Sequence, residues 1–102
     1  MLEMRDLGPV QWVSDRLLVL YPREESLRRV LALAQVDTAR IPFNGIAANA
    51  CWWSALQAAR QGRLLKLVEV MVEEYPVDPW LTAIHSKLSR ERDPYGVTEV
   101  DA

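Results

Sequence analysis

The stretch IPFNGIAANACWWSALQAARQGRLLKLVEVMVEEYP, residues 41–76, contains two helix-period patterns joined by one glycine. The first pattern repeats small and apolar residues at i, i+4, i+7, i+8 and i+11: Ala48, Trp52, Ala55, Leu56 and Ala59. The second places five apolar residues on one helix face: Leu64, Leu67, Val68, Met71 and Tyr75. These spacings predict helices over about 46–61 and 63–75, with Gly62 as the stop between them and Pro76 ending the second.

Two further helices are predicted on the N-terminal side of this stretch. The first covers about 10–21, begins with Pro9 in its first turn, ends before Pro22 and has one apolar stripe: Val10, Val13, Leu17 and Leu20. The second covers about 24–35, and its stripe consists of Leu27, Val30, Leu31 and Ala34. Between residue 35 and the quoted stretch, Asp37 is placed to cap a single helical turn that runs to Arg40.

One more helix is predicted after Pro76, over about 79–90. Asp78 is its expected cap and Pro79 its first residue, and its stripe consists of Leu81, Ile84 and Leu88. No period-two run is long enough to require a strand. We therefore expect an all-α fold, a compact six-helix antiparallel bundle whose third helix is very short.

The composition indicates one ordinary domain. The chain has 102 residues, of which 50% are hydrophobic and 25% charged, and its net charge is −2. A single cysteine, Cys51, excludes an intrachain disulfide, and no apolar run has the length of a signal peptide or a membrane span. We expect a cytoplasmic domain over residues 1–90, followed by a flexible tail or linker over residues 91–102.

Few residues in the sequence point to chemistry. Cys51 and His85 are the only candidates for a thiol nucleophile with a base, and Cys51 falls in mid-helix beside two tryptophans, where a buried small residue is expected. One histidine and one cysteine do not make a zinc site, and no phosphate-loop pattern occurs. We therefore predict no catalytic residues, no metal, no cofactor and no small-molecule substrate.

Several motifs in order resemble a known family. They are DRLLVLYP at 15–22, SLRRVLALAQVD at 26–37, the quoted stretch at 41–76 and VDPWL at 77–81. This order resembles the bacterial effector-associated domains, which are small death-fold-like adaptor modules of conflict and immune signalling. The resemblance spans about residues 10–88, and the positions that carry it most clearly are Trp52, Leu56, Ala59, Gly62, Tyr75 and Pro76. Val36 departs from it, because a glycine is expected there, and this leaves the path of the 34–41 loop open.

The resemblance implies a six-helix, death-like bundle without chemistry of its own. Members of the family are typically fused to, or pair with, proteins that carry effector domains such as proteases or nucleotide-driven switches. By resemblance, we expect an adaptor that recruits a protein carrying a like death-fold domain, or that self-associates.

The adjacent tryptophans have different expected roles. Both the spacing and the resemblance make Trp52 a core position. Trp53 lies about 100° away around the helix, in the sector of Asn49, Gln57 and Arg60. It either packs beneath a neighbouring helix or the 41–46 loop, or it joins a partner-binding surface, where aromatic residues are enriched.

Charges are segregated along residues 60–78. Arg60, Arg63 and Lys66 come first without an acid, and the acids follow without a base: Glu69, Glu73, Glu74 and Asp78. This order opposes the helix dipole, which favours acids at the start of a helix, and such violations tend to occur at functional surfaces. The charges either form two partner-binding patches, with Arg28 and Arg29 joining the basic one if the bundle brings them near, or are an ordinary solvated surface.

Two other functions remain open at this point. The basic run ARQGRLLK at 59–66 is compatible with a small helix-turn-helix DNA-binding domain, although the acidic balance of the chain argues against it. A structural homo-oligomerisation module is the other alternative. The interpretation that the resemblance implies is a non-catalytic protein–protein adaptor, and we expect it to bind neither nucleic acid nor a membrane.

Overall fold

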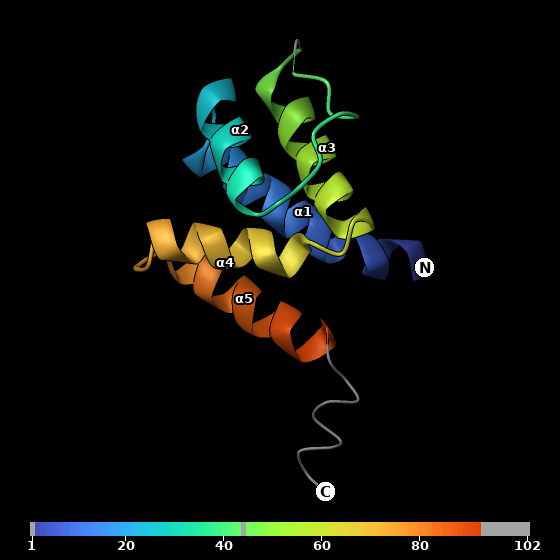
Figure 1. Cartoon of the computed structure of the whole chain (residues 1–102). Coiled ribbons are helices and arrows are strands. Elements are labelled where there is room, and N and C mark those ends of the chain that lie inside the picture. The colour runs from blue at the N-terminus through green and yellow to red at the C-terminus, as the bar shows by residue number, and fades with distance from the viewer. Residues whose placement is uncertain (1, 44, 93–102) are drawn as a thin grey trace, which may run out of the picture.

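The computed structural model describes residues 2–43 and 45–92, and these residues form five α-helices and no strand. The helices are α1 (Leu2–Leu20), α2 (Glu24–Leu33), α3 (Ala47–Arg60), α4 (Leu64–Glu74) and α5 (Pro79–Arg92). Helix α1 lies against α3 and α5, and α4 lies against α2, α3 and α5 (Figure 1). The prediction of an all-helical fold is confirmed for the part of the chain that is described.

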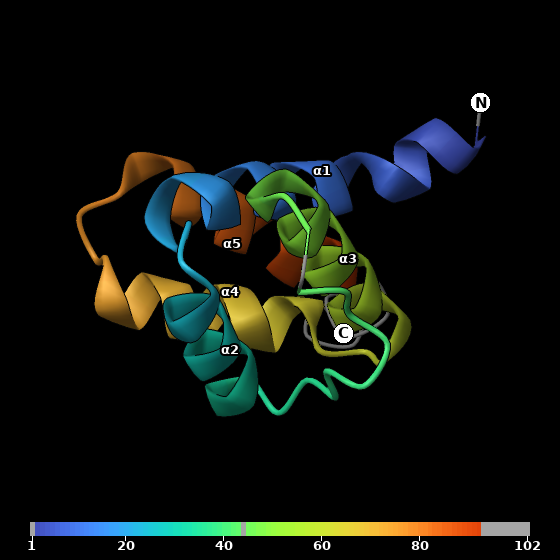
Figure 2. The same ribbon diagram turned by 90° about the horizontal axis from the view of Figure 1, so that it is seen from above.

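Buried side chains from all five helices form one core. Seen from above, α1 and α4 run along opposite sides of the bundle and α3 crosses between them (Figure 2). The largest completely buried side chains are Leu17, Tyr21, Leu31, Leu67, Met71 and Leu81. The predicted stripes of α2 and α5 are all buried, so the predicted inner faces of these two helices are confirmed.

Helix α1 begins at Leu2, earlier than the predicted start near residue 10, and it runs through Pro9. The expectation that Pro9 marks the first turn is therefore wrong. A proline inside a helix removes one hydrogen bond and crowds the carbonyl four residues earlier, but it kinks some helices without ending them, and its restricted φ is a helical value. Of the predicted inner face, Val10, Val13 and Leu17 are buried, and Leu20 is half-buried against the core.

The predicted short third helix is absent, and the count of six helices is corrected to five for the described residues. The Asp37 carboxylate accepts a hydrogen bond from the Ala39 N–H at 3.0 Å, and the segment closes one turn when the Ile41 N–H donates to the Thr38 carbonyl at 3.1 Å. The Gln61 side chain accepts from the Asp37 N–H at 2.7 Å and donates to the Asp37 carbonyl at 3.0 Å. The loop satisfies its backbone through α3 rather than through a helix of its own.

The buried face of α3 differs from the predicted stripe. Its buried residues are Ala50, Cys51, Ser54, Ala55, Gln57 and Ala58. Of the predicted stripe only Ala55 is fully buried; Ala48 is exposed, and Trp52 is half-buried against the edge of the core rather than inside it. Mostly small residues occupy the buried face, and small side chains at a helix contact allow the axes to approach closely. The predicted stripe also contained three alanines, so residue size did not separate the two faces, and spacing alone selected the wrong one.

The chain leaves α2 and α3 through the same kind of left-handed turn. After α3, Gly62 has a φ of 73°, and the Arg63 N–H donates to the Ala58 carbonyl at 2.7 Å. After α2, Gln35 has a φ of 63°, and the Val36 N–H donates to the Leu31 carbonyl at 2.9 Å. Both are Schellman motifs. The prediction of Gly62 as the stop is confirmed, and the left-handed residue of the 34–41 loop is Gln35, which leaves Val36 free to be buried.

Helix α5 continues to Arg92, two residues beyond the predicted end. Glu91 and Arg92, the first two residues of the predicted tail, are helical, and the rest of the predicted tail, residues 93–102, lies outside the described residues. Among the helices that are described, none combines the length and the apolar character needed to cross a bilayer.

The two left-handed turns predict opposite effects of substitution. Gly62→Ala should lower the free energy of unfolding by about 1 kcal/mol, because a Cβ meets no atom there but disfavours the positive φ. Gln35→Gly should raise it by about 0.5 kcal/mol, because relief at positive φ exceeds the added flexibility of the unfolded chain. Urea unfolding followed by circular dichroism measures both.

Gly45→Ala is the matched control for these substitutions. A Cβ at Gly45 would also meet no neighbouring atom, and Gly45 is exposed in a loop, so we expect the substitution to change stability little. Equal effects of alanine at Gly45 and Gly62 would contradict the assignment of the strain to φ.

Candidate functional site

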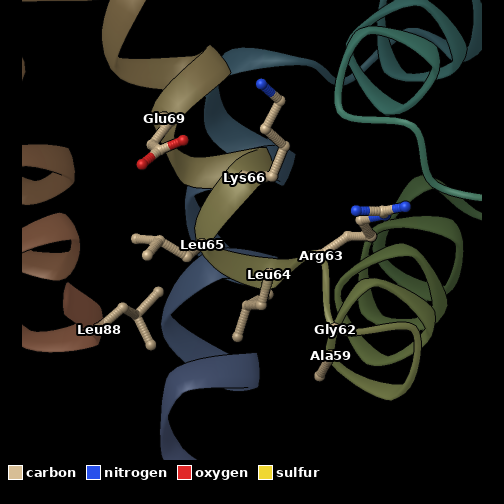
Figure 3. A pocket seen from close by; sticks show the side chains of 8 residues that line it. All are labelled: Ala59, Gly62, Arg63, Leu64, Leu65, Lys66, Glu69 and Leu88. Atoms are coloured by element: carbon tan, nitrogen blue, oxygen red, sulfur yellow. The ribbon is translucent and has the colours of Figure 1, made fainter. Parts of the chain in front are cut away.

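A groove of about 430 Å³ opens where the start of α4 meets the end of α3 and the second half of α5. Leu64, Leu65 and Leu88 line its apolar part, and the side chains of Leu65 and Leu88 point toward one another (Figure 3). Arg63, Lys66 and Glu69 supply its charged lining. We call these six residues the α4 groove.

The turn after α3 places the cations of the α4 groove. Gly62 reverses the chain, so Arg63 becomes the residue that precedes the first turn of α4, and its carbonyl accepts the Leu67 N–H at 2.8 Å. Because Leu67 and Val68 face the core, Arg63 and Lys66 project outward from the first turn. Leu64 and Leu65 are half-buried, between the core and these outward-pointing cations.

Three of the eight predicted partner-binding residues lie together in this groove: Arg63, Lys66 and Glu69. Two others lie on α3, outside its lining. Trp53 is 37% exposed, and Arg60 follows it by two helical turns, so the two share one side of the helix. Gln57, expected in the same sector, is instead buried.

Glu74 belongs to a polar network that joins three helices. The Tyr21 hydroxyl donates to Glu74 Oε1 at 2.6 Å, and the Arg29 guanidinium donates to both carboxylate oxygens. The bond from Arg29, strengthened by that from Tyr21, holds the pKa of Glu74 below its ordinary value against the effect of burial. Burial, together with the bond to Glu74, raises the pKa of Tyr21.

Asp78 is likewise occupied within the fold. Its carboxylate accepts the backbone N–H groups of Trp80 and Leu81 at 2.8 and 3.1 Å, which confirms the predicted cap of α5. It also forms an ion pair with Arg16 at 2.7 Å. Burial opposes its charged form, but these three donors outweigh burial and hold the pKa of Asp78 below its ordinary value. Of the predicted acidic patch, Glu73 alone is exposed and has no partner among the described residues.

Arg28 and Arg29 do not join the basic residues of α4. Arg28 pairs with Glu24 at 2.6 Å and lies 3.9 Å above the ring of Phe43, while Arg29 binds Glu74. The idea that these arginines extend the basic patch is therefore wrong. Local charge rules concern residues three or four positions apart, and the Arg29–Glu74 pair spans 45 positions.

The only cysteine and histidine do not form a nucleophile with its base. Cys51 is buried in α3, as expected, and burial raises the pKa of its thiol to about 11, so the thiolate is disfavoured. His85 on α5 lies 3.8 Å from the Glu69 carboxylate, at the edge of the α4 groove. No sequence signal indicated that contact. Among residues 8–43 and 45–90, whose side chains the structure describes, no three histidine, cysteine or acidic side chains gather as metal ligands would.

These features describe a small all-helical domain with charged surface grooves. The sequence model of effector-associated domain 1 matches residues 6–89. The chain belongs to the effector-associated domain 1 family, and the resemblance drawn from its motifs is confirmed. No curated protein and no solved structure matches the chain.

The Glu74 network predicts a pH-dependent effect on stability. Tyr21→Phe should lower the free energy of unfolding by about 1 kcal/mol at pH 7, because it removes one buried hydrogen bond. Glu74→Gln should also destabilise at pH 7. Since the pKa of Glu74 is depressed in the folded state, its contribution is complete above the ordinary value of 4.5 and is lost as the pH falls through the folded pKa.

Urea unfolding at pH 7, 5 and 3 measures this effect. The stability difference between the original protein and E74Q should shrink toward pH 3. Glu73→Gln, next to it in sequence but exposed, should change little at any of the three values. A difference for E74Q that stays constant from pH 7 to pH 3 would show that the carboxylate charge is not its source.

Proposed function

We propose that this domain is a non-catalytic adaptor that recruits a protein carrying a like, death-fold domain, and that the α4 groove is its docking site. The observation that carries the proposal is the combination in this groove of a leucine lining with two outward-pointing cations. Membership of a family described as effector-associated supports a role in attaching effectors to other proteins.

The α4 groove suits a helix that presents an aliphatic side chain next to carboxylates. The leucines would cover the aliphatic group, and Arg63 and Lys66 would bind the acids at the rim. Rim charges of this kind raise the rate of association and set the choice of partner more than they raise affinity. Trp53 and Arg60 would form a neighbouring contact on α3, and Glu73 would offer an acid at the far end of α4.

A death-like arrangement of the bundle is part of this proposal. The part of the chain that the structure describes has five helices around one core, and Gln61 binds the loop where a third helix was expected; this arrangement is compatible with such an architecture. The positions of the basic residues do not favour DNA binding, because Arg28 and Arg29 are paired with acids and the α4 groove itself contains Glu69.

The sharpest test reverses the rim charges. A two-hybrid screen against a set of effector-associated and other death-like domains first supplies a partner, and calorimetry then measures its affinity. Arg63→Glu with Lys66→Glu should weaken binding about 10-fold or more, a change of about 1.4 kcal/mol or more, with an unchanged circular dichroism spectrum. Binding by the original domain should also weaken with added salt.

Arg23→Glu with Arg40→Glu is the matched control. Both arginines are exposed and lie outside the lining of the α4 groove, and the double reversal changes the net charge by the same amount. Equal loss of affinity in the two double variants would mean that net charge, and not the α4 groove, governs binding. A partner that binds R63E/K66E with full affinity would contradict the proposed docking site.

A further inference from the structure

A second groove, of about 450 Å³, lies between α1 and α5 and shares no lining residue with the α4 groove. Ile84 forms its buried part, and two tryptophans line it. Trp12 on α1 is half-buried against the core, whereas Trp80 on α5 is 65% exposed. We call this site the tryptophan groove.

The exposure of Trp80 is fixed by the cap of α5. Asp78 holds the N–H groups of Trp80 and Leu81, which sets the first turn of the helix. Leu81 is completely buried, and Trp80, about 100° away around the helix, is thereby directed to the surface. A large aromatic side chain on a fixed backbone loses little conformational freedom on binding, which is the property of an interface anchor.

The tryptophan groove carries an acid on its α1 side and a base on its α5 side, and the third charged residue of its lining, Arg16 on α1, is paired with Asp78. Asp15 lies on the α1 side, where its carboxylate accepts a hydrogen bond from Gln11 at 2.9 Å. Lys87 lies on the α5 side, with its ammonium 5.5 Å from the centre of the Trp12 ring. The structure forms no ion pair between Asp15 and Lys87 within the chain. One face therefore combines an aromatic projection, an apolar groove, an acid and a base.

We propose that a second copy of this chain docks on the tryptophan groove through a two-fold contact. Around a two-fold axis, when residue i of the first copy contacts residue j of the second, residue j of the first copy also contacts residue i of the second. Both copies therefore use the same face, which must be complementary to itself. Trp80 of each copy enters the groove of the other against Ile84 and Trp12, and Asp15 of each copy pairs with Lys87 of the other. The acid on the α1 side of the groove and the base on its α5 side argue for this occupant. The proposal does not depend on the adaptor function assigned to the α4 groove.

Charge reversal in two separate samples tests the two-fold contact. Sedimentation from about 1 µM to 1 mM should show the original chain associating to a dimer. Asp15→Lys alone and Lys87→Asp alone should each weaken the dimer about 10-fold or more, since each places like charges together across the axis. An equimolar mixture of D15K and K87D should regain the original affinity, because both cross-copy pairs are then complementary. The D15K/K87D double variant should regain it as well.

Trp80→Ala separates the aromatic contact from the fold. Because Trp80 is mostly exposed, W80A should unfold at the same urea concentration as the original chain while losing the dimer. The proposal is overturned by an original chain that stays monomeric across the range, by a mixture of D15K and K87D that does not associate, or by a W80A dimer of unchanged affinity. R63E/K66E should dimerise normally; loss of the dimer in that variant would place self-association in the α4 groove and would also overturn the proposal.

Discussion

The carboxylates of Glu74, at the end of α4, and of Asp78, four residues later, connect helices that are far apart in the sequence. Glu74 binds the residue that follows α1 through Tyr21 and the exposed side of α2 through Arg29. Asp78 binds α1 through Arg16 and caps α5. Removing either carboxylate would leave partly buried donors without acceptors, which costs more than the net gain from one hydrogen bond. The acidic half of the expected docking surface is therefore mainly structural.

This constraint also decides which surfaces remain for partners. With Glu74 and Asp78 occupied, the charged side chains of α4 that remain accessible are Lys66 and the half-exposed Glu69, beside the half-buried leucines, and Glu73 near the other end of the helix. The cap by Asp78 has a second consequence, because it sets the direction of Trp80 and so shapes the groove between α1 and α5. One side chain thus stabilises a helix end, joins two helices and places an exposed aromatic residue.

Helical spacing predicted the inner faces of α2 and α5 because large aliphatic residues occupy those faces. It failed for α3, where the predicted face and the buried face both contain several alanines, so the pattern did not single out the face of Ala50, Ser54 and Ala58. The third helix was wrongly predicted because the capping signal of Asp37 is also the signal of a turn. For the candidate site, the sequence identified Arg63, Lys66 and Glu69, which are neighbours on one helix, but neither groove and neither long-range ion pair. The grooves and the ion pairs depend on contacts between different helices, and the spacing of residues along one helix does not predict such contacts.

Two grooves of different chemistry suit an adaptor better than one. As proposed, the leucine-lined α4 groove with its two cations would select an acidic, aliphatic partner, whereas the tryptophan groove, which carries both charges, would complement itself. A two-fold dimer through the tryptophans would leave both α4 grooves open, because the two sites share no residue. It would then present two identical docking sites at a fixed separation. Paired sites can strengthen the binding of a paired partner by about 10²- to 10⁴-fold without any new contact, provided that both engage at once. Weak individual contacts would then suffice for recruitment, and loss of the dimer would release the partner.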